Sequence, residues 1–101
     1  MSNVLHVNQK EFEDIIKNND TVFVDFYANW CGPCKMLAPS VEKLADEHSD
    51  IKVVKVDVDQ EGQLAMAYQV QSIPTLIVFK NGQVANRQLG FMPYEALEAM
   101  L

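Results

Sequence analysis

Two cysteines separated by two residues are the clearest chemical feature of this sequence. Cys31 and Cys34 are its only cysteines and lie in the segment WCGPCK, residues 30–35. This spacing brings two sulfurs close enough to bond, so the pair can alternate between a dithiol and a disulfide. If Cys31 attacks a substrate disulfide, Cys34 can then attack the mixed disulfide and release the reduced substrate. The spacing predicts thiol–disulfide exchange through a redox-active Cys31–Cys34 disulfide.

The elements around the cysteines predict which thiol reacts first. The pair lies between a predicted strand, residues 21–28, and a predicted amphipathic helix, residues 35–49, which contains Pro39 and is expected to bend there. Cys31 then falls near the N-terminus of that helix, where unpaired N–H groups and the helix dipole stabilise an anion. We therefore predict that Cys31 is the nucleophile and that Cys34, one turn further in, is the resolving thiol.

A zinc half-site is the alternative use of two cysteines at this spacing, since zinc is often held by two such pairs or by one pair and histidines. Only His6 and His48 could complete it. Neither histidine has the spacing of a metal-binding pair, and they lie in a weak strand and near a helix end. We expect no bound metal.

Asp25 is the strongest anomaly outside the cysteines, because it interrupts the otherwise apolar strand TVFVDFYA. An acid in a central strand is rarely buried without a partner. Desolvation would raise its pKa toward neutrality, which would let it exchange a proton with Cys34. The alternative is a structural acid held in a salt bridge.

Strands and helices alternate along the rest of the chain. Residues 8–18 are predicted to form a helix with a capping box between Asn8 and Glu11, and Asn81-Gly82 signals a tight hairpin. The other predicted elements are a weak strand near Val4, a strand over 51–58, a short helix over 62–69, strands over 75–79 and 83–89, and a last helix with Pro93 in its first turn. This α/β order predicts a mixed sheet, a parallel βαβ half plus an antiparallel hairpin, flanked by helices on both faces.

Size and charge narrow the possible functions. The 101 residues, 49% of them hydrophobic, suit a single domain, 1–101. No segment has the apolar length of a membrane span, and residues 1–6 lack the pattern of a signal peptide, so we expect a cytoplasmic protein with no membrane partner. The net charge of −6 and the scattered basic residues disfavour nucleic acid as a partner.

The sequence resembles the thioredoxin family over nearly its whole length. The matching segments are 24–35 (VDFYANWCGPCK), Pro39, 55–59 (KVDVD), 73–75 (IPT), 79–82 (FKNG) and Gly90. The cysteine pair beside a βαβ pattern is by itself a moderately specific signal. Together these segments are highly specific, and the resemblance implies the thioredoxin fold.

The resemblance also implies roles for residues away from the cysteines. It implies that the strand of Lys55 pairs with that of Asp25, so that the Lys55 ammonium adjusts the pKa of the Asp25 carboxyl. The alternative is a lysine whose stem packs on the protein while its charge extends into water. It implies that Pro74 is cis and faces the cysteines, leaving the backbone of Ile73 free to pair with an extended substrate. The implied substrate surface consists of Trp30, Gly32, Pro33, Ile73, Pro74 and Gly90. For Trp30 the alternative is packing in the core. For Pro74 the alternative is that proline is simply tolerated at the first position of a strand.

The implied activity is that of a monomeric protein-disulfide reductase with no bound cofactor. A separate flavin-containing, NADPH-dependent thioredoxin reductase would recharge it, and its substrates would be protein disulfides, including those of reductases and peroxidases that need a dithiol donor. An oxidant or isomerase is the rival within the fold, disfavoured by Gly32-Pro33 between the cysteines and by the lack of a secretion signal. A docking module switched by redox state and a purely structural subunit are the rivals from other classes.

Several positions depart from the common bacterial pattern of the family. Tyr27 stands where tryptophan is frequent, Gln71-Ser72 lack the usual glycine before Ile73, and Phe91-Met92-Pro93 replace smaller residues after Gly90. The last helix also ends early, at Leu101. These departures bear on substrate preference and stability rather than on the cysteine chemistry.

Overall fold

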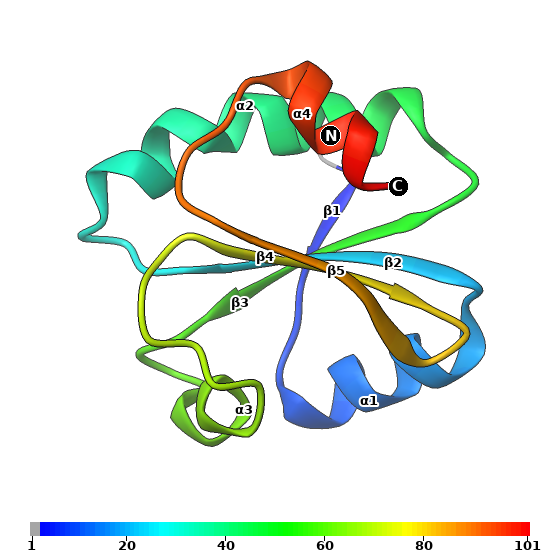
Figure 1. Cartoon of the computed structure of the whole chain (residues 1–101). Helices are drawn as coiled ribbons and strands as arrows, with labels where there is room; N and C mark the ends of the chain where they lie inside the picture. The colour runs from blue at the N-terminus through cyan, green and yellow to red at the C-terminus, as the bar shows by residue number, and fades with distance from the viewer. Residues whose placement is uncertain (1–2) are drawn as a thin grey trace.

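The computed structural model describes residues 3–101, so Met1 and Ser2 of the segment inspected for a signal peptide lie outside the described residues. Strands and helices alternate along the chain before a final hairpin and helix (Figure 1). The elements are β1 Val4–His6, α1 Gln9–Asn18, β2 Thr21–Tyr27, α2 Gly32–Glu47, β3 Lys52–Asp57, α3 Gly62–Ala67, β4 Thr75–Lys80, β5 Gln83–Leu89 and α4 Tyr94–Met100.

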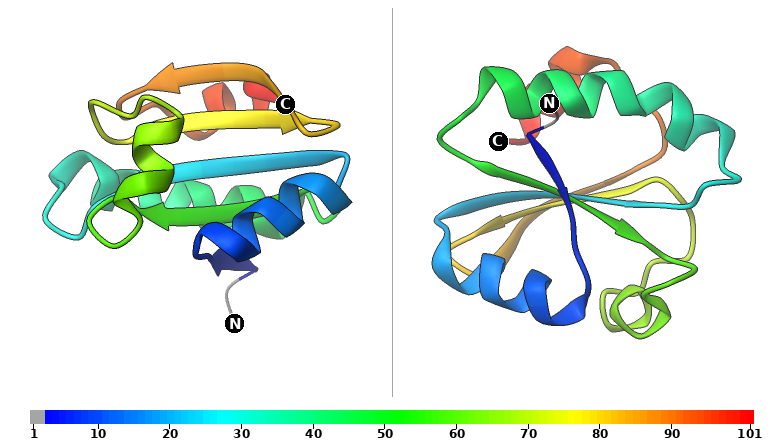
Figure 2. Two further views of the ribbon diagram at one scale, coloured as in Figure 1. Left: turned by 90° about the horizontal axis from the view of Figure 1, so that it is seen from below. Right: turned by 180° about the vertical axis from the view of Figure 1, so that it is seen from behind.

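The five strands form one sheet in the order β1-β3-β2-β4-β5, seen in sequence in the left view of Figure 2. β1, β3 and β2 are parallel, whereas β4 pairs antiparallel with both β2 and β5. The predicted mixed sheet is therefore confirmed, with β2 at its centre. The register places Asp25 of β2 beside Lys55 of β3 on one side and beside Leu76 of β4 on the other.

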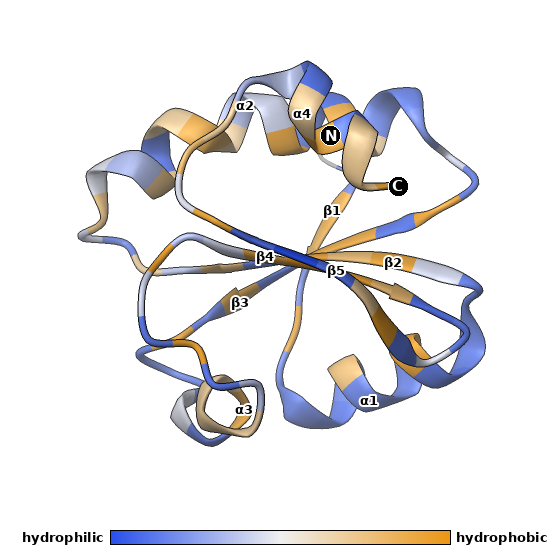
Figure 3. Ribbon diagram, viewed as in Figure 1, coloured by the Kyte–Doolittle hydropathy of each residue, from blue (hydrophilic) through white to orange (hydrophobic). Residues whose placement is uncertain are grey.

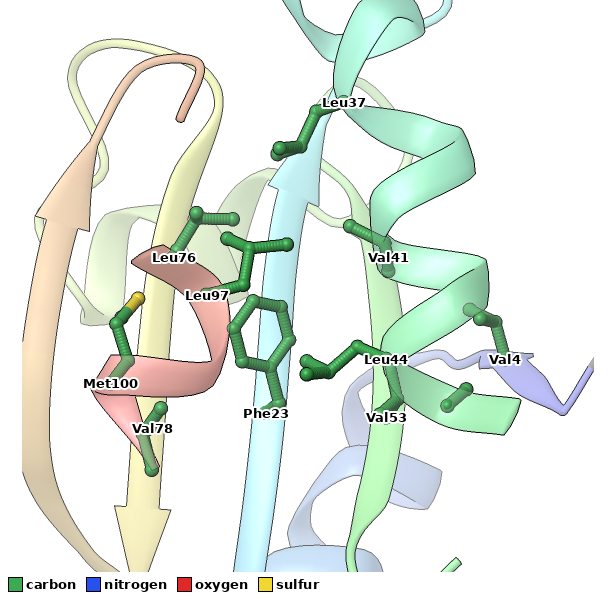
Figure 4. Close-up of a cluster of buried hydrophobic side chains, with 11 residues drawn as sticks. Val4, Phe23, Leu37, Val41, Leu44, Val53, Leu76, Val78, Leu97 and Met100 are labelled. Carbon is green, nitrogen blue, oxygen red and sulfur yellow. The ribbon is translucent and has the colours of Figure 1, made fainter. Parts of the chain in front are cut away.

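Helices cover both faces of the sheet: α2 and α4 lie on one face, and α1 and α3 lie on the other (Figure 1). Because side chains alternate along a strand, β2 supplies both cores. Phe23 packs with residues of α2 and α4, and Figure 4 shows its ring between Leu44 and Leu97. Phe26 packs on the opposite face, with Phe12 of α1 and Leu64 of α3. In Figure 3 the central strand β2 is coloured mainly as hydrophobic and the edge strand β5 carries a hydrophilic stretch, in agreement with the burial of β2 and the exposure of β5.

Local sequence signals account for several boundaries. The Asn8 side chain accepts a hydrogen bond from the Glu11 N–H, and the Glu11 carboxylate accepts one from the Asn8 N–H, so the predicted capping box is confirmed. Asn81 and Gly82 have φ of 54° and 82°, as a tight hairpin turn requires.

Two helices begin elsewhere than predicted. α2 starts at Gly32 rather than Lys35, because the Cys31 side chain caps it and Pro33 fits its first turn. In α4 the first helical residue is Tyr94, and Pro93 is the N-cap with extended backbone. Within residues 3–101, no helix is long and apolar enough to cross a membrane.

Candidate functional site

Three loops meet at one end of the sheet and carry the predicted site. In Figures 1 and 2 they are the connections from β2 to α2, from α3 to β4 and from β5 to α4. The Cys31 Sγ lies 3.8 Å from the carbonyl oxygen of Ile73, and the Gly90 N–H donates a 2.8 Å hydrogen bond to the carbonyl oxygen of Pro74. Residues predicted from three separate parts of the sequence are thus brought together.

Cys31 and Cys34 form a disulfide, with their Cα atoms 5.3 Å apart. Cys31 is the N-cap of α2, and its Sγ accepts a hydrogen bond of 3.2 Å from the backbone N–H of Cys34. An N–H at a helix N-terminus, aimed at a sulfur, is the arrangement that stabilises a thiolate. Both residues are buried, 4% and 3% exposed, so exposure does not distinguish the two thiols.

The Ile73–Pro74 peptide bond is cis, as the resemblance implied. Pro74 is buried, and Ile73 is half-buried against the cysteines. Behind them lies Thr75, a buried polar residue that sequence reasoning missed; its hydroxyl donates a hydrogen bond to the carbonyl oxygen of Ser72. This bond closes the loop that carries Ile73.

The residues around the disulfide are mostly exposed. Gly32 and Pro33 are exposed, and the side chain of Trp30 is 70% exposed, which excludes core packing for that residue. The Trp30 indole N–H donates a 2.8 Å hydrogen bond to the carboxylate of Asp59. Nothing in the sequence singled out Asp59 as the partner, since the two residues meet only through the fold. Phe91, next to Gly90, and Met36, two residues after Cys34, are further exposed hydrophobic side chains.

Asp25 is completely buried, and neither of its carboxylate oxygens has a hydrogen-bond partner among residues 3–101. Burial raises the pKa of Asp25 to about 6, and the charge of Lys55 lowers it in part. The described residues form no ion pair with Asp25, so the structure does not support the alternative of a salt-bridged structural acid. A buried carboxyl of this kind can hold or release a proton near neutral pH.

Lys55 lies on the same face as Asp25, because the two are paired in the parallel register of β2 and β3. It is half-buried, and its Nζ lies 4.2 Å from the centroid of the Tyr27 ring. Lys55, Tyr27 and Cys34 line one cavity of about 100 Å³. The lysine charge therefore lies in the surroundings of both the Cys34 sulfur and the buried acid.

The two histidines considered as zinc ligands have other partners. His6 Nδ1 lies 3.2 Å from the Tyr27 hydroxyl, and His48 Nε2 lies 2.8 Å from a carboxylate oxygen of Glu98. Among residues 3–101, no three His, Cys, Asp or Glu side chains are grouped so as to hold a metal ion.

Sequence comparison with known proteins supports the interpretation of this site as a redox-active cysteine pair. The thioredoxin family model matches residues 3–101. The chain is 45% identical to the thioredoxin of Mycoplasmoides gallisepticum over 94 residues, which cover 93% of this chain and 94% of that protein. It is 51% identical to the thioredoxin of Bacillus subtilis over 81 residues, covering 79% of this chain and 78% of that protein.

Solved structures give the same result. A point-mutant thioredoxin from Halobacterium salinarum superposes with a TM-score of 0.90 at 45% identity, covering 96% of this chain and 86% of that one. A thioredoxin structure from Plasmodium falciparum gives a TM-score of 0.89 at 38% identity, covering 95% and 94%. The thioredoxin fold expected from the sequence is confirmed. The chain belongs to the thioredoxin family and is a thiol–disulfide oxidoreductase.

Proposed function

We propose that this chain is a protein-disulfide reductase in which Cys31 is the nucleophile and Cys34 the resolving thiol. The observation that carries the proposal is the Cys34 N–H directed at the Cys31 sulfur at the N-terminus of α2. A negative charge on that sulfur is stabilised by the N–H and by the helix dipole. The sulfur of Cys34 belongs to a residue inside the first turn and not to the N-cap, so a negative charge on it is not stabilised in this way.

The reaction proceeds in two exchange steps. The Cys31 thiolate attacks one sulfur of a substrate disulfide, a Cys31–substrate disulfide forms, and the other substrate sulfur leaves as a thiolate. Cys34 then loses its proton and attacks the Cys31 sulfur, which forms the Cys31–Cys34 disulfide and releases the second substrate thiolate. Two electrons pass from the dithiol to the substrate. Asp25 in its carboxylate form is the proposed acceptor of the Cys34 proton, and Lys55 tunes its pKa.

The substrate surface is proposed to consist of Trp30, Gly32, Pro33, Ile73, Pro74 and Gly90. Its support is the exposure of Trp30 and the position of the Ile73 carbonyl beside the Cys31 sulfur. An extended segment of a protein could pair with the Ile73 backbone while its disulfide reaches Cys31. Phe91 extends the same surface beyond Gly90 and adds apolar contact area.

Family membership also supports a proposal about the cellular setting of this activity. We propose that the chain acts as a single-domain monomer in the cytoplasm, carries electrons without a bound cofactor, and is recharged by a flavin-containing, NADPH-dependent thioredoxin reductase. Reductases and peroxidases that need a dithiol donor are the proposed substrates.

Reduction of insulin with dithiothreitol as electron source tests the activity. The native chain should accelerate the precipitation of the insulin B chain, whereas Cys31→Ser should not. Cys34→Ser should instead accumulate mixed disulfides through Cys31 and lose turnover. If Cys34→Ser kept full function in a cell that depends on this protein, docking at the substrate surface, not reduction, would be its role.

A further inference from the structure

A row of three side chains crosses the face of the sheet that α2 covers. His6 of β1 is paired with Lys55 of β3, and Lys55 is paired with Asp25 of β2. Paired residues on neighbouring strands point to the same face, so the side chains of His6, Lys55 and Asp25 leave the sheet on one face. The Lys55 charge acts on Asp25 without forming a salt bridge with it. Lys55 is the middle member of this row and has a neighbour on each side.

Tyr27 spans the row. It lies two residues beyond Asp25 on β2 and therefore points to the same face. Its ring centroid is 4.2 Å from the Lys55 Nζ, within the range of a cation–π interaction. Its hydroxyl oxygen is 3.2 Å from His6 Nδ1, and the two rings meet edge to face at 6.0 Å. Tyr27 thus contacts the first and second members of the row at once.

The Lys55 ammonium has two environments within reach. Lys55 and Tyr27 line both the cavity of about 100 Å³ that contains Cys34 and a second, polar cavity of about 280 Å³. Asp57 and Glu61 line the second cavity and would attract the ammonium. A lysine side chain is long and has many rotamers, so a specific contact is needed to hold its charge in one place.

We propose that Tyr27 is a positioning residue of the redox site: its ring holds the Lys55 ammonium near Asp25, and the bond between its hydroxyl and His6 fixes the ring. This inference rests on the proposed roles of Asp25 and Lys55 for its consequence in catalysis. Lys35 of α2 and, in the reduced protein, the Cys34 thiol are further ionisable groups that line the smaller cavity, and the Asp57 and Glu61 carboxyls line the larger one.

The direction of the effect follows from the charges. The positive charge of Lys55 lowers the pKa of Asp25, which burial has raised. If the ring is removed, the ammonium can move toward Asp57 and Glu61, and the pKa of Asp25 rises further. Tyr27 would then act on Asp25 only through Lys55.

The native protein gives the first test. An aromatic ring over the Lys55 ammonium shields the neighbouring methylene protons, so their NMR signals should lie upfield of those of an unstructured lysine. Random-coil positions for these signals would overturn the proposal without any variant being made.

Titration of the Asp25 carboxyl carbon by NMR, in the disulfide form, gives the second test. Tyr27→Leu should raise the pKa of Asp25 by about half a unit, because the Lys55 charge that lowers this pKa would move away from the carboxyl. Tyr27→Phe keeps the ring over Lys55 and loses only the bond that fixes it, and His6→Gln keeps the Tyr27 ring but removes its contacts with the imidazole. Each should therefore produce a smaller rise. In a Lys55→Met background, Tyr27→Leu should cause no additional rise.

Tyr94→Leu is the matched control. Tyr94 also has a lysine over its ring, Lys43 at 4.3 Å, and a hydroxyl bonded to Glu98, but it lies on α4. This variant should leave the pKa of Asp25 unchanged. An unchanged pKa in Tyr27→Leu, or an equal rise when Lys55 is already methionine, would overturn the proposal. The titration is independent of turnover, so its failure is distinguishable from failure of the proposed reductase activity.

Discussion

The backbone N–H of Cys34 points at the sulfur of Cys31, 3.2 Å away, across the first turn of α2. Cys31 therefore both caps the helix and provides the sulfur, and the first turn of α2 provides the N–H that donates a hydrogen bond to this sulfur. Within this arrangement the two cysteines are not equivalent, although they are equally buried. In the proposed mechanism, the helix N-terminus stabilises the N-cap sulfur as an anion in the reduced protein, and the sulfur of Cys34 attacks Cys31 in the mixed disulfide.

Asp25→Asn is expected to slow the resolving step near neutral pH. The carboxylate accepts the Cys34 proton only when it is ionised, above a pH of about 6. The native rate should therefore rise with pH through that value, and the variant should be slower by up to roughly 100-fold at pH 7. Stopped-flow fluorescence of Trp30, the only tryptophan, can follow the step. Exposed Asp50→Asn is the control, and identical profiles of native and Asp25→Asn from pH 6 to 8 would assign Asp25 a structural role.

The same substitution should increase stability at neutral pH. The pKa of Asp25 is about 6 in the folded chain against 3.8 for the free group, so the folded chain binds more protons between these values. Stability attributable to Asp25 is then lost as the pH rises through this window, by about 3 kcal/mol at pH 7. Asp25→Asn should be more stable by about 2 to 3 kcal/mol at pH 7, and the gain should vanish near pH 3. Urea unfolding at several pH values measures this, and a pH-independent difference would contradict it.

Trp30→Ala is expected to weaken the binding of protein substrates but not of small disulfides. Its side chain is exposed and next to the cysteines, so its loss should raise KM for insulin about tenfold. Reduction of a small disulfide should be unaffected, and the free energy of unfolding should change by less than about 1 kcal/mol. Val84→Ala, an exposed apolar residue beside the hairpin, is the control. An equal loss with both substrates would mean that Trp30 acts on the cysteines and not on substrate binding.

Arg87 is expected to stabilise the loop that leads to Ile73 and Pro74. Its guanidinium donates hydrogen bonds to the carbonyl oxygens of Tyr68 and Gln69, at the end of α3, where Gln69 has a φ of 55°. These carbonyls have no partner within the helix. Arg87→Ala should lower the free energy of unfolding by about 1 kcal/mol.

Arg87→Lys should restore less than half of this loss, because one ammonium cannot replace two guanidinium donors. Urea unfolding measures all three proteins, with Gln88→Ala on the opposite face of β5 as control. Full rescue by lysine would show that the charge, and not the paired hydrogen bonds, stabilises the loop.

The sequence predicted those features whose cause is local. The capping box of Asn8 and Glu11 and the hairpin at Asn81-Gly82 depend on side chains a few residues apart, and both were found as expected. Asp25 was identified as unusual because one acid stood out in an apolar strand. The start of α2 was misplaced by one turn, since cysteine is not among the preferred caps and Gly32 disfavours a helix.

Contacts between distant segments could not be predicted in the same way. The meeting of His6, Tyr27 and Lys55 depends on the strand order β1-β3-β2, in which the third strand inserts between the first two. The bonds from Trp30 to Asp59 and from Arg87 to the end of α3 likewise join segments that come together only in the folded chain. The cis state of Pro74 came from the family resemblance, because a general X-Pro bond carries no such signal.

The pKa of the Cys31 thiol in the reduced protein tests the central claim most directly. Thiolate absorbance in the far ultraviolet can be followed against pH in Cys34→Ser, which isolates Cys31 and keeps the backbone N–H at position 34. The account predicts a pKa clearly below the value of about 8.5 of a free cysteine. A Cys31 that titrates at the free value would contradict the claim that the N-terminus of α2 activates it.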